Sequence, residues 1–232
     1  MDTALSPEWV RVLGRQSGSL AVVGPDAVAS GRSLRPLGPF ASIHESDGFV
    51  LLSSDTLDEA PAGLEAVPAG TLAAVVLRRA WQDRTAVLGL LRAAHRVLCS
   101  GGMVLALELD AARLLASSAV RYPLRLRFDS DPEALATLRR TTVDPSSLLI
   151  DATRAGFRGV VDRRIEEERG RYPSWSAFWQ RIREGAWPSL SAMAPEARET
   201  LLAGLERDLR AALPLGDVID REPWVAVTGF RP

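Results

Sequence analysis

The segment from Thr85 to Leu109 constrains the fold most strongly, because it reads as a helix, a glycine turn and a buried strand. Its apolar residues recur at i, i+3, i+4 and i+7, the spacing of one helix face: Val87, Leu90, Leu91, Ala94, Val97 and Leu98. Gly101 and Gly102 tolerate the left-handed conformation that ends many helices. The run Met103–Leu109 is almost entirely apolar. It therefore predicts a strand buried on both faces, as in a parallel sheet covered by helices.

Strand-like and helix-like segments alternate along the rest of the chain. The predicted strands cover residues 19–24, 40–44, 48–53, 71–77, 103–109, 157–165 and 223–230, with late helices starting near 144, 174 and 195. This alternation predicts an α/β layered sheet, mostly parallel, whose last two strands can pair antiparallel at one edge. We expect one domain over residues 1–232, with residues 166–215 as a helical insertion between the last two strands.

Composition and charge exclude several classes of function. The net charge is −1, so we expect neither nucleic acid nor a membrane surface as a partner. All 28 basic residues are arginine, which a coding bias explains better than phosphate recognition. The single Cys99 excludes an intrachain disulfide and a cysteine zinc cluster, and we predict no metal site. Without a secretory signal or an apolar run of roughly 20 residues, a cytoplasmic protein is expected.

The middle of the chain resembles a known family. After the apolar strand at 71–77 come a variable loop, a helix ending in Arg96-Val97-Leu98, the Gly101-Gly102 turn and the next strand, and Ala155-Gly156-Phe157 then lead into a later strand. From Gly63 onward this order is similar to class I S-adenosylmethionine-dependent methyltransferases of the small-molecule type. The resemblance implies a Rossmann-like sheet with helices on both faces, and S-adenosylmethionine as a possible cofactor.

Residues 1–62, which the resemblance makes the cofactor side, depart from the family pattern. The family's first strand ends in a glycine-rich loop, because the cofactor lies directly against backbone there. Gly24 stands at that place, but Pro25 follows it and the next glycine is Gly31. Asp26 is the candidate that could reach the cofactor's ammonium group. The glycine loop is thus degenerate in this chain.

Three further residues are candidates for the same site. Glu45 follows Gly24 by 21 residues, close to the roughly 20-residue spacing of ribose-binding acids in dinucleotide-type sites. The resemblance implies that Asp55 could be the adenine-proximal acid that the family carries after its third strand. Both residues could equally be solvated acids in loops. His44 lies near a strand end, where α/β proteins bind ligands, and is a weak candidate for a general base.

An aromatic set lies between the last two predicted strands and is formed by Trp175, Phe178, Trp179 and Trp187. In the resembled family, segments near this place help to cover the substrate, so these residues are substrate-side candidates. Their spacing is also that of an ordinary helix packed against a core. Both interpretations stay open at this stage.

Three hypotheses on function follow, and one of them is a different small-molecule binder that uses the same crevice. Loss of the glycine loop favours a methyltransferase-like binding or scaffold subunit whose S-adenosylmethionine binding is weak or lost. The alternative is an active S-adenosylmethionine-dependent methyltransferase with an unusual cofactor loop, acting on a small apolar or aromatic molecule. The expected partner is a small molecule or a protein, in a homodimer or a heteromer.

Overall fold

The structure, a computed structural model, describes residues 11, 13, 18–24, 27, 34, 42–46, 49–53, 63–80, 86–116, 122, 125, 132–186, 194–213 and 216–232. The chain divides into two compact units. Unit 1 contains Asp110–Arg140 and Glu166–Pro223, and unit 2 contains Asp2–Leu109, Thr141–Ile165 and Trp224–Pro232. The segment 166–215, predicted as a helical insertion, falls within unit 1.

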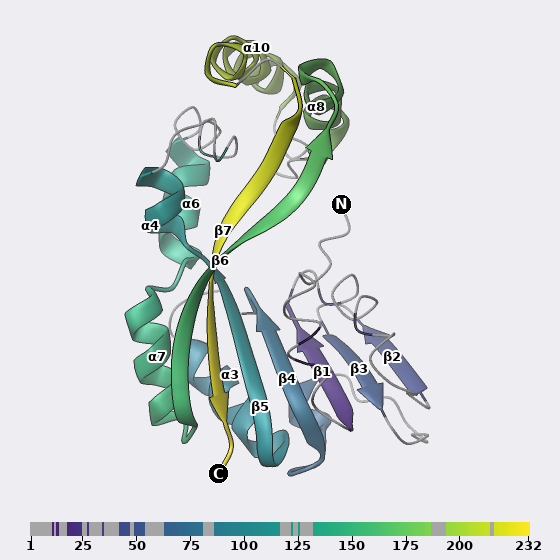
Figure 1. Cartoon of the computed structure of the whole chain (residues 1–232), viewed down its shortest axis with the longest axis vertical. Coiled ribbons are helices and arrows are strands. Elements are labelled where there is room, and N and C mark those ends of the chain that lie inside the picture. The colour runs from purple at the N-terminus through teal and green to yellow at the C-terminus, as the bar shows by residue number, and fades with distance from the viewer. Residues whose placement is uncertain are drawn as a thin grey trace. The chain divides into compact units, whose positions relative to one another are not determined.

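A sheet with the strand order β2-β3-β1-β4-β5-β7-β6 forms the framework of unit 2 (Figure 1). Its strands are β1 (Ser19–Val23), β2 (Ser42–Ser46), β3 (Phe49–Ser53), β4 (Leu72–Arg78), β5 (Leu98–Leu109), β6 (Arg158–Tyr172) and β7 (Val218–Phe230). The central strands β1, β4 and β5 are parallel, and β7 pairs antiparallel with β5. The predicted Rossmann-like α/β sheet is confirmed by this arrangement.

Antiparallel pairing also occurs on the amino-terminal side of the sheet. β2 and β3 form an antiparallel pair, and β3 lies antiparallel beside β1. β2 ends at Ser46 and β3 begins at Phe49, so the connection is far too short for the crossover helix that parallel neighbours need. A hairpin is the only connection of this length. It places β3, rather than β2, next to the first strand.

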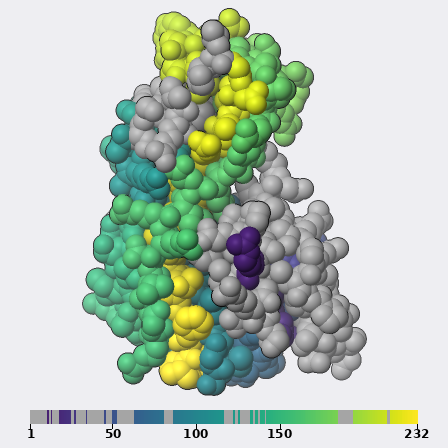
Figure 2. Space-filling view, viewed as in Figure 1, coloured from purple at the N-terminus to yellow at the C-terminus, as the bar shows by residue number. Residues whose placement is uncertain are grey.

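β7 lies between β5 and β6, one strand from the edge of the sheet. Its register with β5 runs from Leu109 opposite Trp224 to Met103 opposite Phe230. The Arg231 guanidinium donates hydrogen bonds to the carbonyl oxygens of Arg96 and Leu98. These hydrogen bonds hold Arg231 beside the start of β5. Figure 2 shows this part of the chain in yellow at the surface, where Phe230 is 42% exposed.

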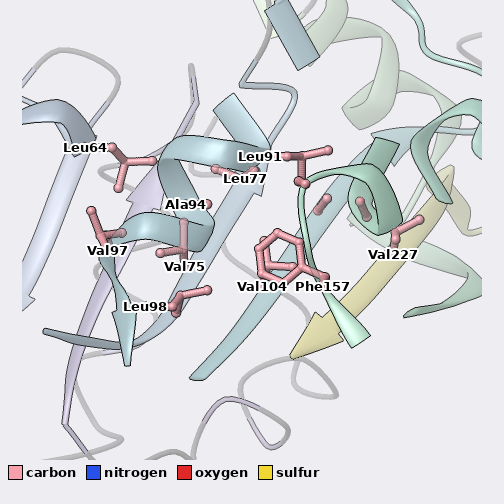
Figure 3. Close-up of a cluster of buried hydrophobic side chains, with 14 of the residues drawn as sticks. Leu64, Val75, Leu77, Leu91, Ala94, Val97, Leu98, Val104, Phe157 and Val227 are labelled. Atoms are coloured by element: carbon pink, nitrogen blue, oxygen red, sulfur yellow. The ribbon is translucent and has the colours of Figure 1, made fainter. Parts of the chain in front are cut away.

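Both faces of the central strands are buried, as the apolar run at 103–109 predicts. One face carries Ala21, Leu51, Val75 and Val104 and packs against α3 (Ala86–Val97) and α7 (Pro145–Arg154) (Figure 3). The α3 residues turned toward this cluster are Val87, Leu91, Ala94 and Val97, which confirms the helical periodicity. The opposite face carries Leu20, Val22, Val50 and Leu52, all at most 1% exposed. The central strands of the sheet are therefore covered on both faces.

Local signals for the two ends of α7 in unit 2 are confirmed. Asp144 caps α7 by accepting a hydrogen bond from the Ser147 amide, and Pro145 occupies the first turn. Gly156, just beyond α7, has φ +105°. Gly101, with φ +76°, does not end the helix as predicted, because α3 ends at Val97 and β5 already begins at Leu98. Both values of φ are backbone conformations that favour glycine. A short 3₁₀ helix, η2 (Leu64–Ala66), precedes β4.

Unit 1 contains the carboxyl-terminal half of β6, the amino-terminal half of β7 and several helices. The helices are α4 (Ala111–Ala116), α6 (Pro132–Thr141, of which Thr141 belongs to unit 2), α8 (Trp175–Arg181), the π-helical turn η3 (Ile182–Ala186) and α10 (Pro195–Ala212). Ser174 caps α8, as its sequence position suggests. β6 and β7 are both longer than predicted and continue through charged residues. No helix in the described ranges is long and apolar enough to cross a membrane.

Candidate functional site

The carboxyl ends of β1 and β4 define the candidate site in unit 2, because open α/β sheets bind ligands at this edge. The two strands are parallel neighbours, and Val23 pairs with Leu77. The next residues, Gly24 and Arg78, therefore lie side by side at the edge. The strand order also changes direction between β1 and β4: β3 and β2 follow on the side of β1, and β5, β7 and β6 follow on the side of β4.

Gly24 is required by the contact between these two strands. Its φ is +139°, and a Cβ atom built on it would lie 1.9 Å from the carbonyl oxygen of Arg78. No side chain could fit between the backbones at this distance. The close approach thus explains the glycine within the protein's own packing, without a cofactor.

Arg78 is a buried cation that sequence reasoning did not single out. Its side chain is 1% exposed, and its guanidinium carbon lies 4.5 Å from the centre of the Trp224 ring. Trp224 is 2% exposed, and its indole Nε1 has no hydrogen-bond partner among the described residues. The available signal was a charged residue directly after the apolar run 72–77, at the carboxyl end of a buried strand.

Glu45, the predicted cofactor-binding acid that lies among the described residues, is not placed beside Gly24. Glu45 is exposed and pairs with Val50, which in turn pairs with Val22 of β1. Since neighbouring strands lie about 4.8 Å apart, Glu45 is about 10 Å from β1 across β3. β2 is parallel to β1, so its carboxyl end, near Glu45, lies at the same edge as Gly24.

The remaining cofactor-side candidates lie partly outside the described residues. Asp26 and Asp55 belong to segments that the structure does not describe, and so does the side chain of His44. The backbone of His44 pairs with Leu51 in the middle of the hairpin. The strand that precedes Asp55 is β3, and its last residues pair with the amino end of β1, since Leu52 is opposite Leu20. β3 therefore ends at the edge of the sheet opposite Gly24.

Three of the four aromatic candidates pack on one another in unit 1. The rings of Trp175 and Trp179 are stacked with centroids 5.6 Å apart, and Phe178 lies 6.1 Å from Trp175. Phe178 is 1% exposed and Trp179 8% exposed. The Arg210 guanidinium of α10 lies 5.8 Å from the Trp175 ring. These contacts join α8 to α10, while Trp187 lies outside the described residues.

A second group of chemistry-bearing side chains lies in unit 1, on the ribbon of β6 and β7. Arg169 Nη1 is 2.6 Å from Glu222 Oε1. Glu166 accepts hydrogen bonds from the Tyr122 hydroxyl and the Arg113 guanidinium. Burial raises the pKa of Asp220 to about 7, with Arg169 opposing the shift and Glu222 adding to it. The sequence signal was the acidic run 166–168, which follows the strand predicted at 157–165 and lies within β6 in the structure.

Two of the residues predicted to hold S-adenosylmethionine, Gly24 and Glu45, lie among the described residues at the sheet edge. Gly24 faces the backbone of β4 where a cofactor-binding glycine faces its ligand, and Glu45 is separated from β1 by a whole strand. Within the described part of the chain, no group of three or more histidine, cysteine, aspartate and glutamate side chains could hold a metal ion.

No protein-family model and no curated protein matches the chain. Among solved structures, phosphoethanolamine N-methyltransferase 2 of Haemonchus contortus, in complex with phosphomonomethylethanolamine and S-adenosylhomocysteine, is similar at a TM-score of 0.38 and 14% identity. The match covers 72% of this chain and 35% of that enzyme, so the chain spans about a third of its length.

Two further methyltransferases give similar values. A putative methyltransferase from Bacillus halodurans matches at a TM-score of 0.37 and 14% identity, over 71% of this chain and 72% of its own. A SAM-dependent methyltransferase from Archaeoglobus fulgidus matches at 0.34 and 14%, over 72% and 62%. At these TM-scores the similarity carries no inference about activity, and the fold class rests on the strand order and pairing given above.

Proposed function

We propose that this chain is a binding or scaffold protein on a methyltransferase-like α/β fold, and that it binds S-adenosylmethionine weakly or not at all. The observation that carries the proposal is the position of β3, antiparallel between β1 and β2. In a doubly wound sheet, the second strand adjoins the first, so that its terminal acid and the glycine loop hold two ends of one ligand. Here the hairpin separates these two elements.

The packing at Gly24 supports the same proposal. A glycine that serves a cofactor leaves its Cβ position open to the ligand, whereas this position is filled by the Arg78 carbonyl. The chemistry of methyl transfer depends mainly on positioning of donor and acceptor. A chain that does not position the methyl donor retains the methyltransferase-like fold but uses it to bind other molecules.

Calorimetric titration of the full chain with S-adenosylmethionine and with S-adenosylhomocysteine tests the proposal. We expect no saturable binding stronger than a Kd of about 100 μM, which corresponds to about −5.5 kcal/mol. Binding below that Kd would contradict the proposal and support the active methyltransferase instead. In that case Glu45→Ala, compared with the control Glu65→Ala in η2, would show whether Glu45 holds the cofactor.

The partner is part of the proposal. A scaffold subunit acts by association, so we expect the purified chain to form a homodimer or to join another subunit or a small molecule. Light scattering after size-exclusion chromatography measures the mass directly. A mass of 25.1 kDa at every concentration would contradict the homodimer and leave the heteromer or the small molecule as the partner.

A further inference from the structure

The ribbon of β6 and β7 in unit 1 buries the carboxylates of Asp220 and Glu222 beside the guanidinium of Arg169. Arg169 on β6 pairs with Glu222 on β7 at 2.6 Å, with side chains 14% and 9% exposed. Asp220, two residues earlier on β7, is 2% exposed. Because Arg169 lies close to both acids, it carries the positive charge for which they compete.

Asp220 differs from its neighbour in its hydrogen bonds. Glu222 Oε1 accepts from Arg169, whereas Asp220 Oδ1 has no hydrogen-bond partner among the described residues. A buried carboxylate without a donor favours its protonated form. Accordingly, the pKa of Asp220 is raised to about 7, mainly by burial; Arg169 opposes this shift and Glu222 adds to it.

Among the described residues, Arg169 is the only cation that acts on the charge of Asp220. Tyr172 on β6 lies close to Asp220. Burial raises the pKa of the Tyr172 hydroxyl and the charge of Asp220 raises it further, so the hydroxyl stays neutral. Arg181 of α8 hydrogen-bonds to that hydroxyl and pairs with Glu184 at 3.2 Å. Glu167 on β6 is a further buried acid. Ionisation of Asp220 thus adds a negative charge that must be shared by Arg169.

We propose that Asp220 is the proton-binding group of a pH-operated device in this ribbon. When the carboxyl is protonated, Arg169 is left to Glu222 and β6 and β7 are held together at this pair. When Asp220 releases its proton to water, the two carboxylates compete for Arg169, and the segments Glu166–Tyr172 and Val218–Pro223 open more readily. The device is independent of the proposed function.

The change reaches α8 through Tyr172. The Tyr172 ring lies edge-on to Phe178 at 5.1 Å between centroids, and Phe178 also contacts Trp175 of the stacked pair. Gly170 makes room for the tyrosine, since a Cβ atom there would lie 2.8 Å from the Tyr172 hydroxyl oxygen. Loosening of the ribbon would therefore expose aromatic surface on α8.

Hydrogen–deuterium exchange of the full chain at pH 5 and pH 7, corrected for the intrinsic pH dependence, tests the proposal. With a pKa of about 7 when closed and 3.8 when open, the opening equilibrium of the two segments should rise about 50-fold between these pH values. The variant Asp220→Asn should remove this rise. The control Asp217→Asn, at an exposed position just before β7, should keep it.

A change of less than about fivefold in the wild type, or an equal change in Asp220→Asn, would overturn the proposal. Carboxyl-carbon nuclear magnetic resonance of the wild-type chain supplies a second measurement that needs no variant to fold. Titration of Asp220 near neutral pH supports the device, and titration below about pH 5, near the ordinary range of a carboxyl group, contradicts it.

Discussion

The guanidinium carbon of Arg78 lies 4.5 Å from the centre of the Trp224 ring, and both side chains are almost completely buried. The contact connects the last residue of β4 to β7, which are separated in the sheet by β5. A desolvated cation over an indole face contributes about 2 kcal/mol. Trp224 thus holds the end of β4 at the edge where the sheet would bind a ligand.

Replacing this tryptophan should destabilise unit 2. Trp224→Ala removes a buried ring and leaves the Arg78 guanidinium without its aromatic partner, so the free energy of unfolding should fall by about 3–5 kcal/mol in chemical denaturation. Phe230→Ala, on the same strand but 42% exposed, is the matched control and should cost less than half as much. Equal losses would show that the Arg78 contact does not stabilise the sheet.

Gly24 should tolerate no side chain. Gly24→Ala would place a Cβ atom against the Arg78 carbonyl at φ +139°, so we expect a loss of about 3 kcal/mol or more in the same measurement. Gly89 on α3 is the matched control, because a Cβ there meets nothing within 4 Å. Gly89→Ala should instead stabilise the chain by about 0.5–1 kcal/mol. An unchanged free energy of unfolding in Gly24→Ala would contradict the close approach of Gly24 to the Arg78 carbonyl.

Arg169 should be essential to the ribbon at alkaline pH. Arg169→Met leaves Glu222 and Asp220 as buried carboxylates without a cation, which should cost about 3–5 kcal/mol at pH 8. The exposed pair Arg183–Glu199, with side chains 54% and 57% exposed, provides the control, and Arg183→Met should cost less than about 1 kcal/mol. The loss in Arg169→Met should shrink at pH 5, where Asp220 is protonated. A loss independent of pH would contradict this account.

The pH dependence of stability carries a definite sign at Asp220. Its pKa is about 7 in the folded chain against 3.8 ordinarily, so its protonated form favours folding. This contribution is complete below pH 3.8, is lost as the pH rises to about 7, and does not change further above it. This difference in pKa between the folded chain and the ordinary carboxyl group corresponds to about 4 kcal/mol in the free energy of unfolding. Urea denaturation of Asp220→Asn should lack this part of the slope, whereas Asp217→Asn should retain it.

Local signals in the sequence were sufficient for most of the framework of the fold. The helical periodicity of Val87–Val97, the cap at Asp144 and the apolar run of β4 each act over a few residues, and each is found in the structure. The sequence could not give the direction of β3. Strand direction depends on which neighbour a strand meets, and the hairpin is evident only from the observed strand bounds at Ser46 and Phe49.

The candidate site was less accessible for the same physical reason. The spacing from Gly24 to Glu45 predicts an acid near the first strand only if the second strand adjoins it, and β3 intervenes. The partners of buried charges are also invisible in sequence. Arg169 and Glu222 are far apart along the chain, so their ion pair could not be predicted from sequence. The sequence therefore predicts that the strand ends at Ile165, although β6 continues through the acidic residues after it to Tyr172.

The place of β7 has a consequence for how the protein is made. β5 pairs on one side with β4, which is near in sequence, and on the other with residues such as Phe230 that are synthesised much later. Contacts of such long sequence separation form slowly. Until β7 arrives, the nascent chain presents an apolar strand edge that can pair with other chains. We expect the yield of soluble protein to depend on the residues from Trp224 to Phe230 and on chaperones that cover β5 during synthesis.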